Sequence, residues 1–341
     1  MPVDWVHQFI TATADWLSTP GSTVHTFQVR AFIALLLVAL ACGVLGSLVV
    51  GNRMAFFSDA MAHTAMAGVT LSLLLLVLLA NVQNMRQADD YLWLVPLAMA
   101  VFGVVIGLMI AFIQERTALA SDTVIGVFFA FSLGFAGLLM PALRKRINLD
   151  LEGVLFGQLQ FIDDARLLIL FGMAAVTCGV VVWKYNSFVF GSFNPVLAKS
   201  RGLSVRFNTY LFVALLALVV NLSIYAVGVL LINALLVVPA AAAANVAGNL
   251  RRMFWVTLSG CVGCVLVGYR VSSVTQIPLG PGKDDVLYPG PSGAVVVACV
   301  GWFFASLGVR AVRRRFFGAA VPCPHTSCSH VHSGGEYPHP H

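Results

Sequence analysis

Nearly uninterrupted runs of apolar residues, each about 20 residues long, recur along the whole of this 341-residue chain. A helix of that length crosses the hydrocarbon core of a bilayer. Only 10% of the chain is charged and 59% is hydrophobic, whereas soluble domains carry roughly a quarter charged residues. Most of the charged surface that a soluble domain needs is therefore missing. We predict an all-α membrane protein, a polytopic helical bundle whose outer surface faces lipid.

The predicted organisation has three parts. Residues 1–30 form an N-terminal periplasmic or interfacial segment without a recognisable signal peptide, 31–310 form the transmembrane domain, and 311–341 form a His- and Cys-rich tail without a fixed fold. About nine transmembrane helices are expected, at 31–50, 54–80, 91–113, 123–141, 166–184, 208–226, 228–247, 253–271 and 291–310.

The distribution of basic residues predicts the orientation. Loops on the cytoplasmic side of a membrane carry an excess of Lys and Arg. The hairpin residues Arg251 and Arg252 and the run Arg313–Arg315 place the C-terminus inside and the N-terminus outside, although the cluster 144–146 opposes this assignment. The basic residues are scattered over loops and do not form one face, so nucleic acid is not an expected partner.

Asp59 and His63 interrupt the second apolar run, four residues apart. In a helix the two side chains share a face, and ionisable groups inside a membrane are costly unless they are paired or face a wet cavity. A carboxylate and an imidazole make half of a site for a borderline divalent cation such as Zn²⁺ or Mn²⁺. The alternative is a structural contact of Asp59 with Arg53 or His63.

Other polar residues within the spans have two interpretations. Asn221, Tyr225 and Asn233 line a transport pathway or bond to a neighbouring helix. Pro239 is expected to kink or break its helix, and Asp122 is expected to be an N-cap.

The cytoplasmic segment "NPVLAKSRG" is predicted to form a compact helix. Asn194 is placed as its N-cap, Pro195 at its first position, and Gly202 as its terminator, with Lys199 and Arg201 late in the helix. It is either a docking site for another protein or a well-capped loop helix.

The tail concentrates ligands for soft and borderline metals. Such tracts bind metals without a fold, and thiolate ligands favour zinc over manganese; compositional drift is the alternative. The candidate ligands are Cys323, His325, Cys328, His330, His332, His339 and His341.

Two further motifs have weaker interpretations. Cys261 and Cys264 form a CxxC inside a span, where cysteines are usually small apolar residues. The "GPGKDD" segment does not match a phosphate-binding loop. The chain is therefore not expected to hydrolyse ATP by this route, and energy coupling is left to a partner.

Several blocks, in order, resemble the integral permeases of metal-ion ABC importers. These blocks are "RMAFFSDAMAHTAMAGV", "SDTVIGVFFAFSLG", "LDLEGVLFGQLQFI", "FNPVLAKSRGL" and "AVGVLLINALLVVPAAAAANVA", which cover about 31–310. In the fourth block the family commonly has an acidic residue where this chain has Asn194.

The resemblance implies a type II ABC importer-like permease in a bacterial inner membrane, working as a homodimer. A separate ATPase subunit would drive it and a periplasmic protein would deliver the metal, with Asp59 and His63 in the metal path and no permanently bound cofactor. Together with the candidate metal ligands of the tail, the resemblance favours Zn²⁺ as the transported ion, and Mn²⁺ or Fe²⁺ are the alternatives. The rival hypotheses are a proton-coupled secondary carrier and a permease for a metal chelate.

Overall fold

The computed structural model describes residues 26–52, 54–79, 94–117, 119–144, 162–193, 204–274, 277–278, 286–287 and 290–317. Several predicted features lie outside these ranges. They are residues 1–25 of the N-terminal segment, most of the third block of the resemblance, Arg53, the docking residues Asn194, Pro195, Lys199, Arg201 and Gly202, and all seven candidate metal ligands of the tail.

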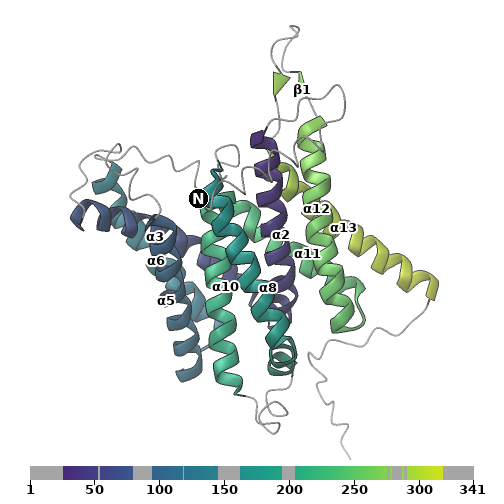
Figure 1. Cartoon of the computed structure of the whole chain (residues 1–341). Coiled ribbons are helices and arrows are strands. Elements are labelled where there is room, and N and C mark those ends of the chain that lie inside the picture. Colours follow the sequence, from purple (N-terminus) through teal and green to yellow (C-terminus); the bar gives the residue numbers. More distant parts are fainter. Residues whose placement is uncertain are drawn as a thin grey trace, which may run out of the picture.

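Nine helices make up almost all of the described part of the chain (Figure 1). The predicted all-α helical bundle is confirmed. Two short strands, β1 (Ile277–Pro278) and β2 (Val286–Leu287), form an antiparallel ribbon between the last two helices. The helices are α2 (Thr26–Gly51), α3 (Ala55–Leu79), α5 (Leu94–Arg116), α6 (Ser121–Arg144), α8 (Asp164–Phe193), α10 (Val205–Val227), α11 (Val229–Val246), α12 (Leu250–Val274) and α13 (Pro291–Phe317).

Eight of these helices are long and apolar enough to cross a membrane, among the residues described. The helix that carries Asp59 and His63 is α3, and its first half is rich in small and polar residues. Such a helix is stable in a bundle because other helices surround it, and α3 packs against α5, α6 and α10.

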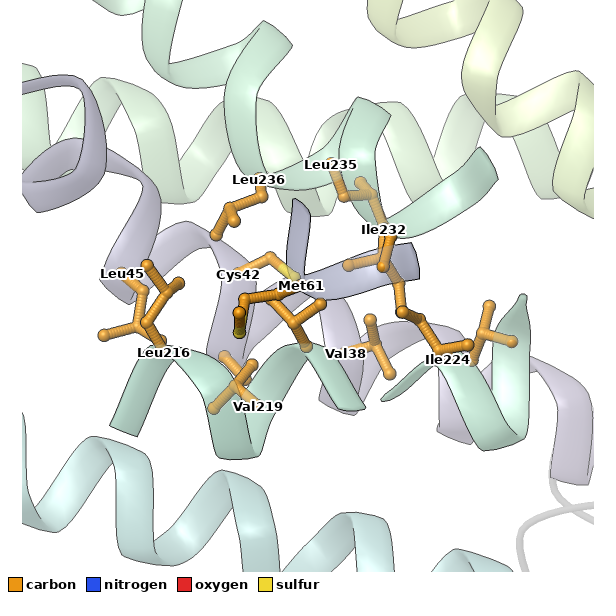
Figure 2. Close-up of a cluster of buried hydrophobic side chains, with 14 of the residues drawn as sticks. Val38, Cys42, Leu45, Met61, Leu216, Val219, Ile224, Ile232, Leu235 and Leu236 are labelled. Carbon is orange, nitrogen blue, oxygen red and sulfur yellow. The ribbon is translucent and has the colours of Figure 1, made fainter. Parts of the chain in front are cut away.

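The core lies where α2 and α3 pass between α10 and α11 (Figure 2). Met61 of α3 and Cys42 of α2 are fully buried there, against Val219 of α10 and Ile232 of α11. α10 and α11 are joined by Gly228 alone, whose φ of 92° lies in the region that glycine adopts readily. The chain therefore passes from α10 to α11 within a single residue.

Three local expectations differ from the structure. α8 continues as a helix to Phe193, through residues expected to be a loop. α11 runs unbroken through Pro239, so the predicted helix break is wrong; membrane bundles can re-satisfy the backbone groups that a proline frees. Asp122 lies in the first turn of α6 and not at the cap position, where its carboxylate still faces the positive end of the helix dipole.

Candidate functional site

The candidate site is built around the first turns of α3. Asp59 and His63 lie one turn apart on this helix, as their spacing predicts. Asp59 is exposed in the isolated subunit and His63 is half-buried, while the residues between them, Ala60 to Ala62, are buried. The helix therefore turns its small residues into the bundle and presents the carboxylate at an open face.

Asn233 of α11 is the hydrogen-bond partner of Asp59. Its Nδ2 donates a hydrogen bond to Asp59 Oδ1 at 2.9 Å, although 174 residues separate the two in the chain. The Oδ1 of Asn233 is buried, and in the described part of the structure it has no hydrogen-bond partner. The pair thus leaves one amide oxygen beside the carboxylate that can accept a donor or bind a cation.

His63 lies against α6. Its ring meets the ring of Phe129 edge-on, with 4.5 Å between the ring centroids and an interplanar angle of 72°. Its Nδ1 is buried and has no hydrogen-bond partner among the described residues. A neutral imidazole carries a lone pair on one ring nitrogen, so His63 has a nitrogen that no described group of the protein occupies.

The contacts of α3 with α5 place Asp59 at middle depth in the bundle. Gly68 packs against Met99 near the start of α5, and Phe57 reaches Gly107 in its second half. Asp59 lies between these two levels, far from either end of the 23-residue α5. An exposed carboxylate at this depth needs water or a covering protein surface, because contact with lipid tails is too costly.

The other two pathway candidates lie elsewhere. Asn221 is fully buried and donates from Nδ2 to the carbonyl of Ala217 in its own helix, at 2.7 Å. Tyr225 is half-buried, and the guanidinium of Arg166 lies 4.9 Å from its ring centroid. Of the three candidates, Asn233 is the one that the structure joins to Asp59.

Residue-level reasoning assigned no role to Phe129, although it is part of the second block that carries the resemblance. Its aromatic type gave no signal by itself, because aromatic residues are common throughout the spans. Its position opposite His63 depends on how α3 packs against α6, and that is a tertiary contact.

The CxxC of α12 is buried in the core. Cys261 donates a hydrogen bond from Sγ to the carbonyl of Leu235 at 3.3 Å, and Cys264 is also buried. No group of three or more His, Cys, Asp or Glu residues suited to a metal ion occurs within the described ranges. Both cysteines therefore pack as small apolar residues, and the donors beside Asp59 come from His63 and Asn233.

Comparison with protein families matches residues 24–283 to the ABC 3 transport family. The manganese transport system membrane protein MntC of Listeria monocytogenes is 27% identical over 84% of this chain and 92% of that protein. The uncharacterized membrane protein slr2045 of Synechocystis is 30% identical over 77% of this chain and 87% of that protein. The high-affinity zinc uptake system membrane protein ZnuB of Haemophilus influenzae is 25% identical over 79% of this chain and 92% of that protein.

A solved structure from Streptococcus pneumoniae shares the fold over most of both chains. PsaBC from Streptococcus pneumoniae in complex with Fab superposes with a TM-score of 0.65, covering 89% of this chain and 95% of that chain at 23% identity. The expectation that the chain is a transport component and not an enzyme is confirmed by the family match and by the two relatives that are named as membrane proteins of metal transport systems. The chain belongs to the ABC 3 transport family.

Proposed function

We propose that this protein is the permease subunit of an ABC importer, and that a divalent transition-metal ion passes Asp59, His63 and Asn233 on its way through the membrane. The observation that carries the proposal is the exposed carboxylate of Asp59 at middle depth, with an imidazole one turn away. A charged group in this position is costly unless it is paired or faces water, and such groups commonly mark ion pathways. A carboxylate attracts a cation directly.

The donors around Asp59 suit such a cargo. The carboxylate oxygens, the unpaired nitrogen of His63 and the unpaired amide oxygen of Asn233 are ligand types that first-row divalent metals accept. Without an ion, the Asn233 amide donates to the carboxylate. Rotation of the amide by half a turn exchanges its nitrogen for its oxygen, so the same side chain can serve the empty and the occupied site.

Zn²⁺ is our proposed cargo. The tail carries two cysteines and five histidines among its candidate ligands, Cys323, His325, Cys328, His330, His332, His339 and His341, and thiolate ligands favour zinc. The similarity to a protein named as part of a zinc uptake system is consistent with this proposal.

Mn²⁺ is the second candidate, and Fe²⁺ follows it on the same ligands. Two of the three donor groups at this site, the Asp59 carboxylate and the Asn233 amide oxygen, are oxygen donors, and manganese prefers oxygen. Relatives named as manganese transport proteins also support Mn²⁺.

The proposed assembly contains two copies of this chain in a bacterial inner membrane, an ATPase subunit and a periplasmic metal-binding protein. The open face of α3 around Asp59 supports pairing of two copies across a central path. The segment from Asn194 to Gly202 is proposed to dock on the ATPase, with the N-terminus of the chain outside and the C-terminus in the cytoplasm.

Uptake of radioactive zinc and manganese by cells that express the complete importer tests the metal path. Asp59→Ala and His63→Ala are each expected to abolish uptake at normal membrane levels of the protein. Asp122→Ala is the matched control, because this carboxylate is also exposed but lies in the first turn of α6. Full uptake by both path variants would refute the role of the pair.

A reconstituted complex distinguishes the ion and the energy source. ATPase stimulation by the binding protein, loaded with one ion at a time, is expected to be strongest with zinc. Uptake that continues without the ATPase and collapses with an uncoupler would instead identify a proton-coupled carrier. Lack of competition by free zinc would favour a chelate permease.

A further inference from the structure

Arginines gather where α12 begins and α13 ends. The two helices run antiparallel, because Gly268 near the end of α12 packs on Val295 near the start of α13. At the opposite end Asn245, just before α12, accepts a hydrogen bond at its Oδ1 from Arg310 Nη1 at 3.1 Å. The arginines with described side chains at this end are Arg251, Arg252, Arg310, Arg313 and Arg315.

These arginines have no anionic partner among the described residues. Glu115 pairs with Arg206 and Asp164 pairs with Arg30, both in other helices. Arg310 bonds to a neutral amide, and Arg313 and Arg315 are exposed. The end of α13 therefore carries several positive charges that no described carboxylate neutralises, on a helix whose residues up to Arg313 are apolar enough to cross a membrane.

A cavity that is largely open to the surface lies beside these charges. It has a volume of about 640 Å³ and is lined by Leu307, Arg310, Ala311 and Arg315. Its described lining combines two apolar side chains, Leu307 and Ala311, with the two arginines. In Figure 1 the C-terminal half of α13 points away from α12, and Phe304, Val309 and Val312 on this half are exposed. The cavity thus opens where exposed apolar side chains give way to guanidinium groups.

We propose that this cavity binds the headgroup phosphate of an anionic phospholipid. Arginine binds phosphate through charge-assisted hydrogen bonds, and basic pockets at the ends of transmembrane helices attract anionic lipids. Leu307 and Ala311 contact the first methylene groups of the acyl chains. An acidic protein surface would have to cover these apolar residues as well, whereas a lipid matches both halves of the lining.

Native mass spectrometry of the purified full-length protein tests the proposal, after transfer from mixed bilayers of phosphatidylglycerol and phosphatidylcholine. The wild-type protein is expected to retain phosphatidylglycerol in preference to phosphatidylcholine. The variant R313Q/R315Q removes two charges and leaves the bond between Arg310 and Asn245 in place, and it is expected to lower this preference about tenfold. An unchanged preference in this variant overturns the proposal.

Three controls separate a lipid site from general electrostatic attraction. Arg270→Gln removes an exposed arginine at the other end of α12 and is expected to leave the preference unchanged; an equal loss overturns a local site. R313K/R315K keeps both charges and is expected to retain the lipid, and its loss there overturns the electrostatic account. Added inorganic phosphate is expected to leave the retained lipid in place, and complete displacement would show a simple anion site and overturn the lipid assignment.

Discussion

At the scale of single residues, the hydrogen bond from Asn233 to Asp59 joins two polar side chains at middle depth in an apolar bundle. The amide holds the carboxylate on the side of α11, and His63 on the next turn lies against Phe129 of α6. The two donors of α3 are therefore positioned by two different helices.

Replacing Asn233 by Leu is expected to reduce metal uptake by at least about tenfold, since a lost hydrogen bond to a charged group accounts for about 1.5–3 kcal/mol. Leucine has a similar volume but neither donates to Asp59 nor offers an oxygen to the ion. Uptake by whole cells at equal membrane levels is the measurement. Asn245→Leu, which removes an amide at the other end of α11, is the control and should transport normally. Normal uptake by Asn233→Leu would exclude this residue from the path.

Gly103→Ala is expected to destabilise the protein by about 1–3 kcal/mol, the usual range for overpacking. A Cβ at this position would lie 2.0 Å from Nδ2 of the fully buried Asn221. Thermal unfolding in detergent measures the effect. Gly126→Ala, where a Cβ meets nothing within 4 Å, should be neutral or slightly stabilising. Asn221→Ala should restore the stability of Gly103→Ala, and a double variant as unstable as the single one would contradict the steric explanation.

At the scale of helices, two ion pairs connect neighbours with different degrees of burial. Arg30 of α2 pairs with Asp164 of α8 at 2.9 Å, and the two side chains are 23% and 14% exposed. Arg206 of α10 pairs with Glu115 of α5, with side chains 83% and 29% exposed. Exposed pairs contribute little to stability, while removal of one partner from a buried pair leaves an uncompensated charge. The α2–α8 pair is therefore the one that matters for stability.

Arg30→Met is expected to lower the free energy of unfolding by about 1–3 kcal/mol, below the value for a fully buried pair because some water reaches these groups. Arg206→Met is expected to lower it by less than about 1 kcal/mol. Thermal unfolding of both variants under the same conditions gives the comparison. Arg30→Met with Asp164→Leu should recover stability, because no charge is left unpaired. Equal losses from the two single variants would be inconsistent with this ranking.

Helix identity and approximate length were predictable, since hydropathy and run length are properties of local sequence. The extension of α8 to Phe193 was not, because "KYNSFVFGSF" is less apolar than the span before it and reads as a loop. The continuity of α11 through Pro239 was also missed. In both segments, packing against the surrounding helices stabilises a helix that the local sequence does not predict. The sequence of the segment alone does not reveal this packing.

At the scale of the whole molecule, the open face of α3 around Asp59 is the surface that most needs a covering protein or water. Phe56 is 67% exposed and lies one turn from the exposed Asp59. Apolar side chains on the periphery, such as Val182 at 78% exposed, can face lipid without cost. The carboxylate cannot, so the face that contains it requires a protein partner or water.

A photo-crosslinking residue in place of Phe56 is expected to yield crosslinked pairs of this chain in the assembled importer. The same residue in place of Val182, on a part of α8 that we expect to face lipid, is the control and should crosslink to lipid or not at all. Denaturing electrophoresis after irradiation separates the products. Pairs from the Val182 position, and none from the Phe56 position, would place the interface between copies on a different face.

The sequence by itself determined that the chain is a helical membrane protein, where its spans lie, and that Asp59 and His63 share one helical face. These conclusions follow from hydropathy, length and the helical repeat, all of which act over a few turns. Its motifs also identified the permease family. Asn221, Tyr225 and Asn233 remained equivalent candidates, since each is a polar residue in an apolar run. Only the tertiary structure joined Asn233 to Asp59 and placed Phe129 against His63, because such pairings depend on which helices pack together across long separations in the chain.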